Sequence, residues 1–84
     1  MDSNLEAAHK HSFKNYDEIL GSKECGCFYC KAVFLSSLIS EWVDEKDGGQ
    51  TALCPKCAID SVIGDKSGYQ LTQQFLSDMN KYWF

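Results

Sequence analysis

The sequence predicts a small α+β domain with a cysteine-based staple, and three observations lead to this fold class. The chain has 84 residues, a length at which a hydrophobic core alone leaves a domain only marginally stable. Five cysteines are present, and four of them form two Cys-x-x-Cys pairs, a pattern typical of small domains that add a metal. Helix-like and strand-like stretches alternate along the chain. We expect residues 1–84 to form one such domain.

The N-terminal part of the chain predicts a helix. Apolar residues recur there roughly at helical intervals, and Gly21 stands where a left-handed C-terminal cap would lie. A second reading stays open, in which residues 1–12 are frayed and only a short helix forms from about Asn15 to Leu20.

The central part predicts short elements around the cysteines. Residues 31–35 ("KAVFL") suit a strand, and residues 50–53 ("QTAL") suit another after the turn signal "KDGGQ". Residues 36–45 predict one or two turns of helix because their apolar residues are spaced i, i+1, i+4, i+5.

Two further helices are predicted in the C-terminal half. Pro55 suits the first position of a helix that ends near Gly64, with apolar residues again spaced i, i+1, i+4, i+5. After the turn "DKSG", Thr72 suits the cap of a last helix. The apolar stripe of this helix is Phe75, Leu76, Met79, Tyr82 and Trp83.

The cysteine spacing predicts one structural zinc ion. Cys27-x2-Cys30 and Cys54-x2-Cys57 can each place two sulfurs on one ion through a tight turn, and two such pairs complete a tetrahedral site. Iron, redox-active dithiols and disulfides are the alternatives. Cys25 is the spare thiol; it either replaces Cys27 through a Cys25-x4-Cys30 pairing or stays free beside the cluster.

The order of elements around these pairs predicts a treble-clef zinc finger. In that arrangement a knuckle (a tight turn with two ligands) is followed by a β-hairpin and by a helix that carries the second pair, here with flanking N- and C-terminal helices. A zinc ribbon, which places the second pair on a hairpin, is the alternative.

Charge and composition indicate which classes of macromolecule this chain can bind. There are eight lysines, no arginine and twelve acidic residues, for a net charge of −4. General nucleic-acid binders need a basic surface and use arginine to read phosphate and guanine. Nucleic acid is therefore an unfavourable partner for this chain, and another protein is the expected one.

The expected compartment follows from the cysteines and the N-terminus. The first residues ("MDSNLEAAHKHSFK") contain no apolar segment after a basic start, and no apolar run is long enough to span a bilayer. Paired cysteines in a reducing cytoplasm indicate metal ligands, so we expect a cytoplasmic protein without a membrane partner.

A candidate binding surface lies around the end of the helix predicted for residues 55–64 and at the C-terminus. Its alternative is a solvated helix face followed by a turn. The residues of this surface are Asp60, Ser61, Asp65, Ser67, Tyr69, Trp83 and Phe84.

Several long motifs of the sequence resemble those of a known group of proteins. "CGCFYC", "EWVDE", "TALCPKCAIDSVIGDKSGY" and "MNKYWF" together resemble a family of small uncharacterised bacterial cytoplasmic proteins with a treble-clef-type zinc finger. The resemblance covers roughly residues 13–84. It implies zinc, a cytoplasmic location and Cys27, Cys30, Cys54 and Cys57 as ligands, and it names no activity.

The predicted function is a zinc-stabilised interaction module, a protein-binding adapter or regulator without catalysis. A closed four-cysteine site leaves no coordination position for a substrate. A nucleic-acid-binding zinc-finger regulator is the alternative. A metal-dependent nuclease of the HNH type is disfavoured, because no histidine follows His11.

Overall fold

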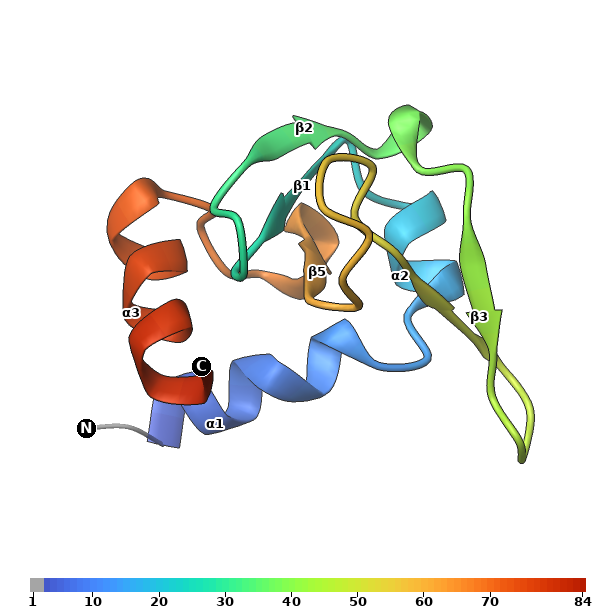
Figure 1. Cartoon of the computed structure of the whole chain (residues 1–84), viewed down its shortest axis with the longest axis horizontal. Coiled ribbons are helices and arrows are strands. Elements are labelled where there is room, and N and C mark those ends of the chain that lie inside the picture. Colours follow the sequence, from blue (N-terminus) through green and yellow to red (C-terminus); the bar gives the residue numbers. More distant parts are fainter. Residues whose placement is uncertain (1–2) are drawn as a thin grey trace.

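The computed structural model describes residues 3–84 of the chain. Helices at the two ends of this part of the chain enclose a series of short strands (Figure 1), and short 3₁₀ helices are called η here. In chain order the elements are α1 (Ser3–His9), η1 (Lys10–Ser12), α2 (Tyr16–Leu20), β1 (Glu24–Cys27), β2 (Val33–Leu35), η2 (Ser36–Leu38), β3 (Trp42–Asp44), β4 (Gln50–Ala52), β5 (Val62–Gly64), η3 (Asp65–Ser67) and α3 (Gln73–Trp83).

Two small antiparallel sheets organise the chain. The larger has the strand order β2-β1-β5, with Cys25 opposite both Phe34 and Gly64. The smaller is the β3–β4 hairpin, in which Val43 lies opposite Thr51. The predicted α+β class is therefore confirmed in its coarse form.

The three-stranded sheet separates two apolar cores. Side chains alternate between the faces of a strand, and along β1 the buried Cys25 and Cys27 belong to one core. Gly26 between them faces the other side, where a Cβ would lie 3.2 Å from the Leu76 side chain. In β5, Val62 belongs to the first core and Ile63 to the second.

The two cores differ in composition. Three cysteines contribute to the first core, which contains Ile19, Cys25, Cys27, Phe34, Ile39, Ala52, Cys54 and Val62. The second core contains Ala8, Phe28, Ile63, Leu76 and Met79 and lies where α1 and α3 pack together, beside each other in Figure 1. Two of the candidate metal ligands, Cys27 and Cys54, thus belong to the core that has the smaller share of large aliphatic side chains.

The N-terminal helix is interrupted. Residues 3–12 are helical as α1 and η1, the chain then extends, and α2 starts at Tyr16. Lys14 has a φ of 50°, which an α-helix cannot contain. The prediction of one continuous helix was therefore wrong, and Ala8 of α1 packs in the second core. Residues 1 and 2 of the segment expected to fray lie outside the described residues.

The helix predicted for residues 36–45 was wrong. Only Ser36–Leu38 forms a short 3₁₀ turn, and Trp42–Asp44 is the strand β3. The positive φ angles of Gly48 (106°) and Gly49 (84°) form the turn that lets β3 pair with β4. Hydrogen bonding to a neighbouring strand replaces the helix that the apolar spacing favoured.

The helix predicted for residues 55–64 was also wrong. Residues 55–57 form a turn, Ala58 has a φ of 66°, and Val62–Gly64 is the third strand of the larger sheet. The left-handed residue stops helix propagation, and β-branched Val62 and Ile63 suit a strand. Because the treble clef required this helix, that assignment is not confirmed. The zinc-ribbon alternative does not apply either, since the second pair lies between β4 and β5, which belong to different sheets.

Three other predictions are confirmed. Strands form within the predicted segments 31–35 and 50–53. The last helix starts where expected, and the Thr72 side chain accepts a hydrogen bond from the N–H of Phe75 (3.1 Å). Leu76 and Met79 are the buried residues of its stripe.

Candidate metal centre

The first cysteine pair lies on a tight turn between β1 and β2, the first knuckle (residues 27–32). The N–H of Lys31 donates to the carbonyl of Cys27 (2.8 Å), and the N–H of Cys27 donates to the carbonyl of Ala32 (2.9 Å). Lys31 has a left-handed φ of 65° that turns the chain back into β2. The turn thereby holds Cys27 and Cys30 within reach of one ion.

The second pair repeats this geometry in the second knuckle (residues 54–59). The N–H of Ala58 donates to the carbonyl of Cys54 (2.9 Å), and the N–H of Cys54 donates to the carbonyl of Ile59 (3.0 Å). Ala58, with its φ of 66°, occupies the position of Lys31. Two segments of different sequence therefore adopt the same turn around a Cys-x-x-Cys pair.

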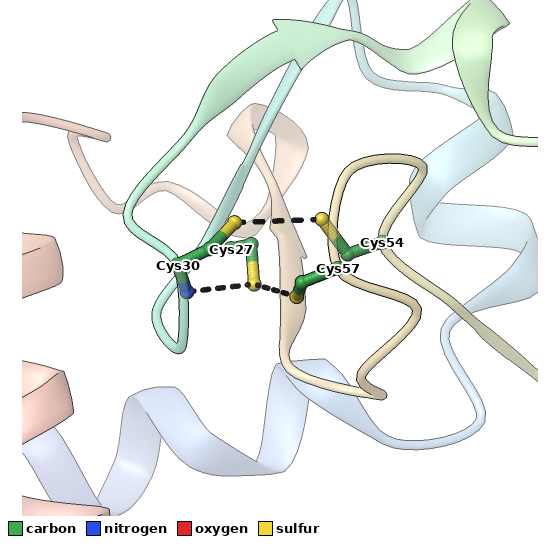
Figure 2. A group of neighbouring side chains, drawn as sticks. All are labelled: Cys27, Cys30, Cys54 and Cys57. Carbon is green, nitrogen blue, oxygen red and sulfur yellow. Dashed lines mark hydrogen bonds between the residues drawn. The ribbon is translucent and has the colours of Figure 1, made fainter.

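The two knuckles bring their four sulfur atoms together (Figure 2). Sγ of Cys27 lies 3.6 Å from Sγ of Cys57, and Sγ of Cys30 lies 3.7 Å from Sγ of Cys54. All four sulfurs lie within 4.8 Å of one another. These separations are longer than a disulfide bond, in which the sulfurs are about 2.05 Å apart.

This spacing fits one tetrahedral metal ion. Metal–sulfur bonds of about 2.3 Å at tetrahedral angles separate the sulfurs by about 3.8 Å. The four cysteines are thus positioned to bind a single ion with four thiolate ligands, a donor set typical of zinc and iron sites.

Backbone amides point at the first sulfur of each knuckle. Sγ of Cys27 accepts from the N–H groups of Tyr29 (3.4 Å) and Cys30 (3.5 Å). Sγ of Cys54 accepts from the N–H of Lys56 (3.3 Å). These donors stabilise negative charge on the sulfurs, as a metal–thiolate centre requires.

The thiols of the cluster influence one another. Burial raises the pKa of the Cys27 thiol, but hydrogen bonds from Ser61 and from the amides of Cys30 and Tyr29 outweigh this effect, so its pKa is lowered. The pKa of Cys57 rises to about 12, through burial first and then through its hydrogen bond with Cys27 and the charge on Cys27. The pKa of Cys30 is raised in the same way. A divalent cation would remove this repulsion and release the remaining protons.

Cys25 lies outside the cluster. Its side chain is fully buried in the first core, and it is not among the four sulfurs that converge. Burial, and secondarily the negative charge of Asp65, raises the pKa of Cys25 to about 12. The Cys25-x4-Cys30 pairing is therefore not the arrangement of this structure, and Cys25 is an apolar core residue.

The four candidate ligands differ in their exposure to solvent. Cys27 and Cys54 are buried, Cys57 is half-buried and Cys30 is exposed. A groove of about 480 Å³ beside the second knuckle reaches Cys54 and Cys57, with Leu38, Leu53 and Lys56 in its lining. The centre is consequently accessible to solvent from one side.

The polar residues of the predicted binding surface have different environments. Ser61 is buried and its Oγ lies 3.0 Å from Sγ of Cys27, so it is not part of an exposed surface and that prediction was wrong. Asp60 is exposed. The Asp65 carboxylate accepts from the N–H groups of Lys23 (3.2 Å) and Glu24 (3.0 Å) at the start of β1.

Two further residues of that prediction lie after η3. Oγ of Ser67 accepts from the N–H of Tyr69 (3.3 Å). The Tyr69 ring stacks on Phe75, with centroids 5.5 Å apart. Both residues are half-buried, and the Tyr69 ring also lies 5.7 Å from the His11 ring.

Trp83 and Phe84 lie beside the first knuckle and α1. The Trp83 ring lies 4.0 Å from the His9 ring, and its Nε1 donates to the carbonyl of Leu5 (3.2 Å). The Phe84 ring lies 4.9 Å from the ring of Tyr29. Sequence reasoning did not include Tyr29 in this group, because it lies far away along the chain.

Asn15 is a second residue that sequence reasoning missed. It is buried, and its Nδ2 donates to the carbonyls of His11 and Val62 (both 2.9 Å) while its Oδ1 accepts from the N–H of Ala52 (3.0 Å). Asn15 thus connects η1, β4 and β5 through its side-chain hydrogen bonds. A cap-like position before a helix was its only sequence signal.

No family model, curated protein or solved structure is similar enough to this chain to give a match. The family resemblance drawn from the sequence motifs therefore remains a prediction. Within residues 3–84, no helix has the length and apolar character needed to cross a membrane.

Proposed function

We propose that this chain is a structural-zinc interaction module that binds another protein and has no catalytic activity. The single observation that carries the proposal is the convergence of four cysteine sulfurs from two matching knuckles. Zinc is the proposed ion, and a reducing compartment such as the cytoplasm would keep the thiols available to it.

The predicted role of zinc is to stabilise the fold. Four protein thiolates fill a tetrahedral zinc ion, which leaves no position for water or substrate. The first core contains three cysteines and borders the site, so metal binding adds directly to the stability of this half of the molecule. Zinc binding free energies of about 10–16 kcal/mol in small domains become folding free energy.

An exposed aromatic group supports a protein partner. Tyr29, Tyr82, Trp83 and Phe84 expose 47%, 38%, 37% and 59% of their surface. Tyrosine and tryptophan are enriched among the few residues that supply most of the binding energy in protein interfaces. The net charge of −4 and the absence of arginine weigh against nucleic acid.

Metal analysis tests the first half of the proposal. Protein purified under reducing conditions is expected to contain one zinc per chain by elemental analysis, and stoichiometric chelator is expected to remove it with loss of near-UV circular dichroism. Protein that is folded and free of metal, and that gains no stability from added Zn²⁺, would overturn the proposal.

Partner capture with matched variants tests the second half. Phe84→Ser removes an exposed aromatic residue of the group, and Leu20→Ser removes a side chain of similar exposure (61%) on α2. A tagged wild type is expected to retain a partner at about 150 mM salt that Phe84→Ser loses and Leu20→Ser keeps. Equal capture by both variants would contradict this surface, and a salt-sensitive gel shift with DNA or RNA would favour the nucleic-acid alternative.

A further inference from the structure

Ser61 contacts the first knuckle through both its backbone and its side chain. It lies between the second knuckle and β5 and is 1% exposed. Its carbonyl accepts from the N–H of Phe28 (3.0 Å), and its Oγ lies 3.0 Å from Sγ of Cys27. One residue next to the second knuckle therefore fixes the position of the first.

The direction of the side-chain bond follows from metal chemistry. A cysteine that ligates a metal carries no proton, so Sγ of Cys27 can only accept. The Ser61 hydroxyl must then be the donor. Within residues 3–84, Ser61 supplies the one side-chain hydroxyl that contacts the four-sulfur cluster.

With this bond, the first sulfur of the first knuckle has more hydrogen-bond partners than the first sulfur of the second knuckle. Sγ of Cys27 accepts from two backbone amides and faces the Ser61 hydroxyl, whereas Sγ of Cys54 accepts from the amide of Lys56. Cys27 is fully buried in the apolar core that also contains Ile19, Phe34 and Val62. Negative charge in such a place is costly unless hydrogen bonds compensate for it.

We propose that Ser61 is the positioning residue of the metal centre, whose hydroxyl directs the Cys27 thiolate toward the ion and whose carbonyl holds the first knuckle against the second. The inference rests on the proposed function, because it assumes that the cluster binds a metal. Hydrogen-bond partners of metal ligands typically change metal affinity by about 10–100-fold when removed.

The test compares Ser61→Ala, which removes the hydroxyl, with Ser61→Thr, which keeps it. Ser12→Ala is the control, because Ser12 is also buried but its Oγ donates to the carbonyl of His9 (2.7 Å), away from the sulfurs. The full-length chain is loaded with Co²⁺, a spectroscopic substitute for Zn²⁺. The readouts are the sulfur-to-cobalt charge-transfer absorption and the affinity for Co²⁺ and Zn²⁺ in competition with a chelator.

Ser61→Ala is expected to bind both ions about 10–100-fold more weakly. Its charge-transfer absorption should move to lower energy, because a thiolate without the hydrogen bond donates electrons more readily. Ser61→Thr should restore both properties, and Ser12→Ala should leave both unchanged even where it lowers stability.

An unchanged spectrum and affinity in Ser61→Ala would overturn the role of Ser61 and leave the zinc module intact. If Ser61→Ala binds no metal, metal binding by Ser61→Thr would support the role of the Ser61 hydroxyl. If neither variant binds metal while Ser12→Ala does, that role would be overturned. A wild type without thiolate-to-cobalt absorption would instead refute the proposed function itself, and the inference with it.

Discussion

Lys31 and Ala58 adopt almost the same left-handed backbone conformation, with φ angles of 65° and 66°. Each directly follows the second cysteine of a pair, and each donates its N–H to the carbonyl of the first cysteine. A Cβ in this region of backbone space costs about 1–2 kcal/mol. The matching angles therefore indicate that the four-sulfur geometry is maintained against local strain in both knuckles.

Glycine at position 58 should relieve that strain. Ala58→Gly is expected to leave the free energy of unfolding of the metal-loaded protein unchanged or to raise it by up to about 1 kcal/mol, because glycine adopts positive φ readily but also loses more entropy on folding. Ala58→Val should lower it by more than about 1 kcal/mol, since β-branched residues tolerate this region poorly. Urea unfolding at saturating Zn²⁺ measures both.

Ala7→Gly is the matched control for this comparison. Ala7 is exposed within α1, where glycine should cost up to about 1 kcal/mol relative to alanine. A loss of stability in Ala58→Gly similar to that in Ala7→Gly would show that position 58 is not strained in solution.

The five cysteines should divide into four ligands and one core residue. Cys27→Ser is expected to abolish stoichiometric zinc binding, because serine cannot replace a buried thiolate ligand. Cys25→Ala should keep one zinc per chain and lose about 1–2 kcal/mol of unfolding free energy, as expected for truncating a buried apolar side chain. Elemental analysis and urea unfolding measure the two effects.

Alkylation gives an independent check on Cys25. In the metal-loaded protein Cys25 should be the slowest thiol to react with iodoacetamide, because it is buried and its pKa is raised to about 12. Among the four candidate ligands of the metal-loaded protein, exposed Cys30 should react first. Early modification of Cys25 in peptide mass spectra would contradict its place in the core.

The sequence predicted the features that depend on neighbouring residues. The Cys-x-x-Cys spacing is local, and so are the Thr72 cap and the "KDGGQ" turn. β5 could not be predicted in this way, because Val62 and Ile63 have a spacing that suits a helix and their strand partner is β1, far away along the chain. The contacts of Ser61 with Cys27 and of Asn15 with Val62 are equally distant in sequence, so only the folded chain reveals them.

Asn15 should be among the residues most sensitive to substitution outside the cysteines. Asn15→Ala leaves the N–H of Ala52 and the carbonyl of Val62 without their buried partner, which should cost about 2–4 kcal/mol. Asn15→Asp should not restore stability, because a carboxylate would face the carbonyls of His11 and Val62. Thermal and urea unfolding of the metal-loaded protein measure these losses.

Asn80→Ala provides the comparison for this amide. Asn80 donates through Nδ2 to the carbonyl of Tyr29 (3.1 Å) at the surface, where water can replace it, so the expected loss is below about 1 kcal/mol. Equal losses in Asn15→Ala and Asn80→Ala would refute the role of Asn15 in joining η1 to β4 and β5.

Asp65 should contribute a pH-dependent part of the stability. The amide of Glu24, and secondarily that of Lys23, holds the pKa of the Asp65 carboxyl below its usual value of 3.8. A carboxyl whose pKa is lower in the folded state stabilises the fold above the unfolded-state pKa, and this contribution is lost as the pH falls through the folded-state value. Wild type should therefore be more stable than Asp65→Asn by a constant margin from about pH 5 to 7, and the margin should shrink below about pH 4.

Loss of metal at low pH affects both proteins, so the difference between their urea unfolding free energies isolates Asp65. A margin that stays constant down to pH 3 would mean that the carboxylate does not bind the two amides at the start of β1.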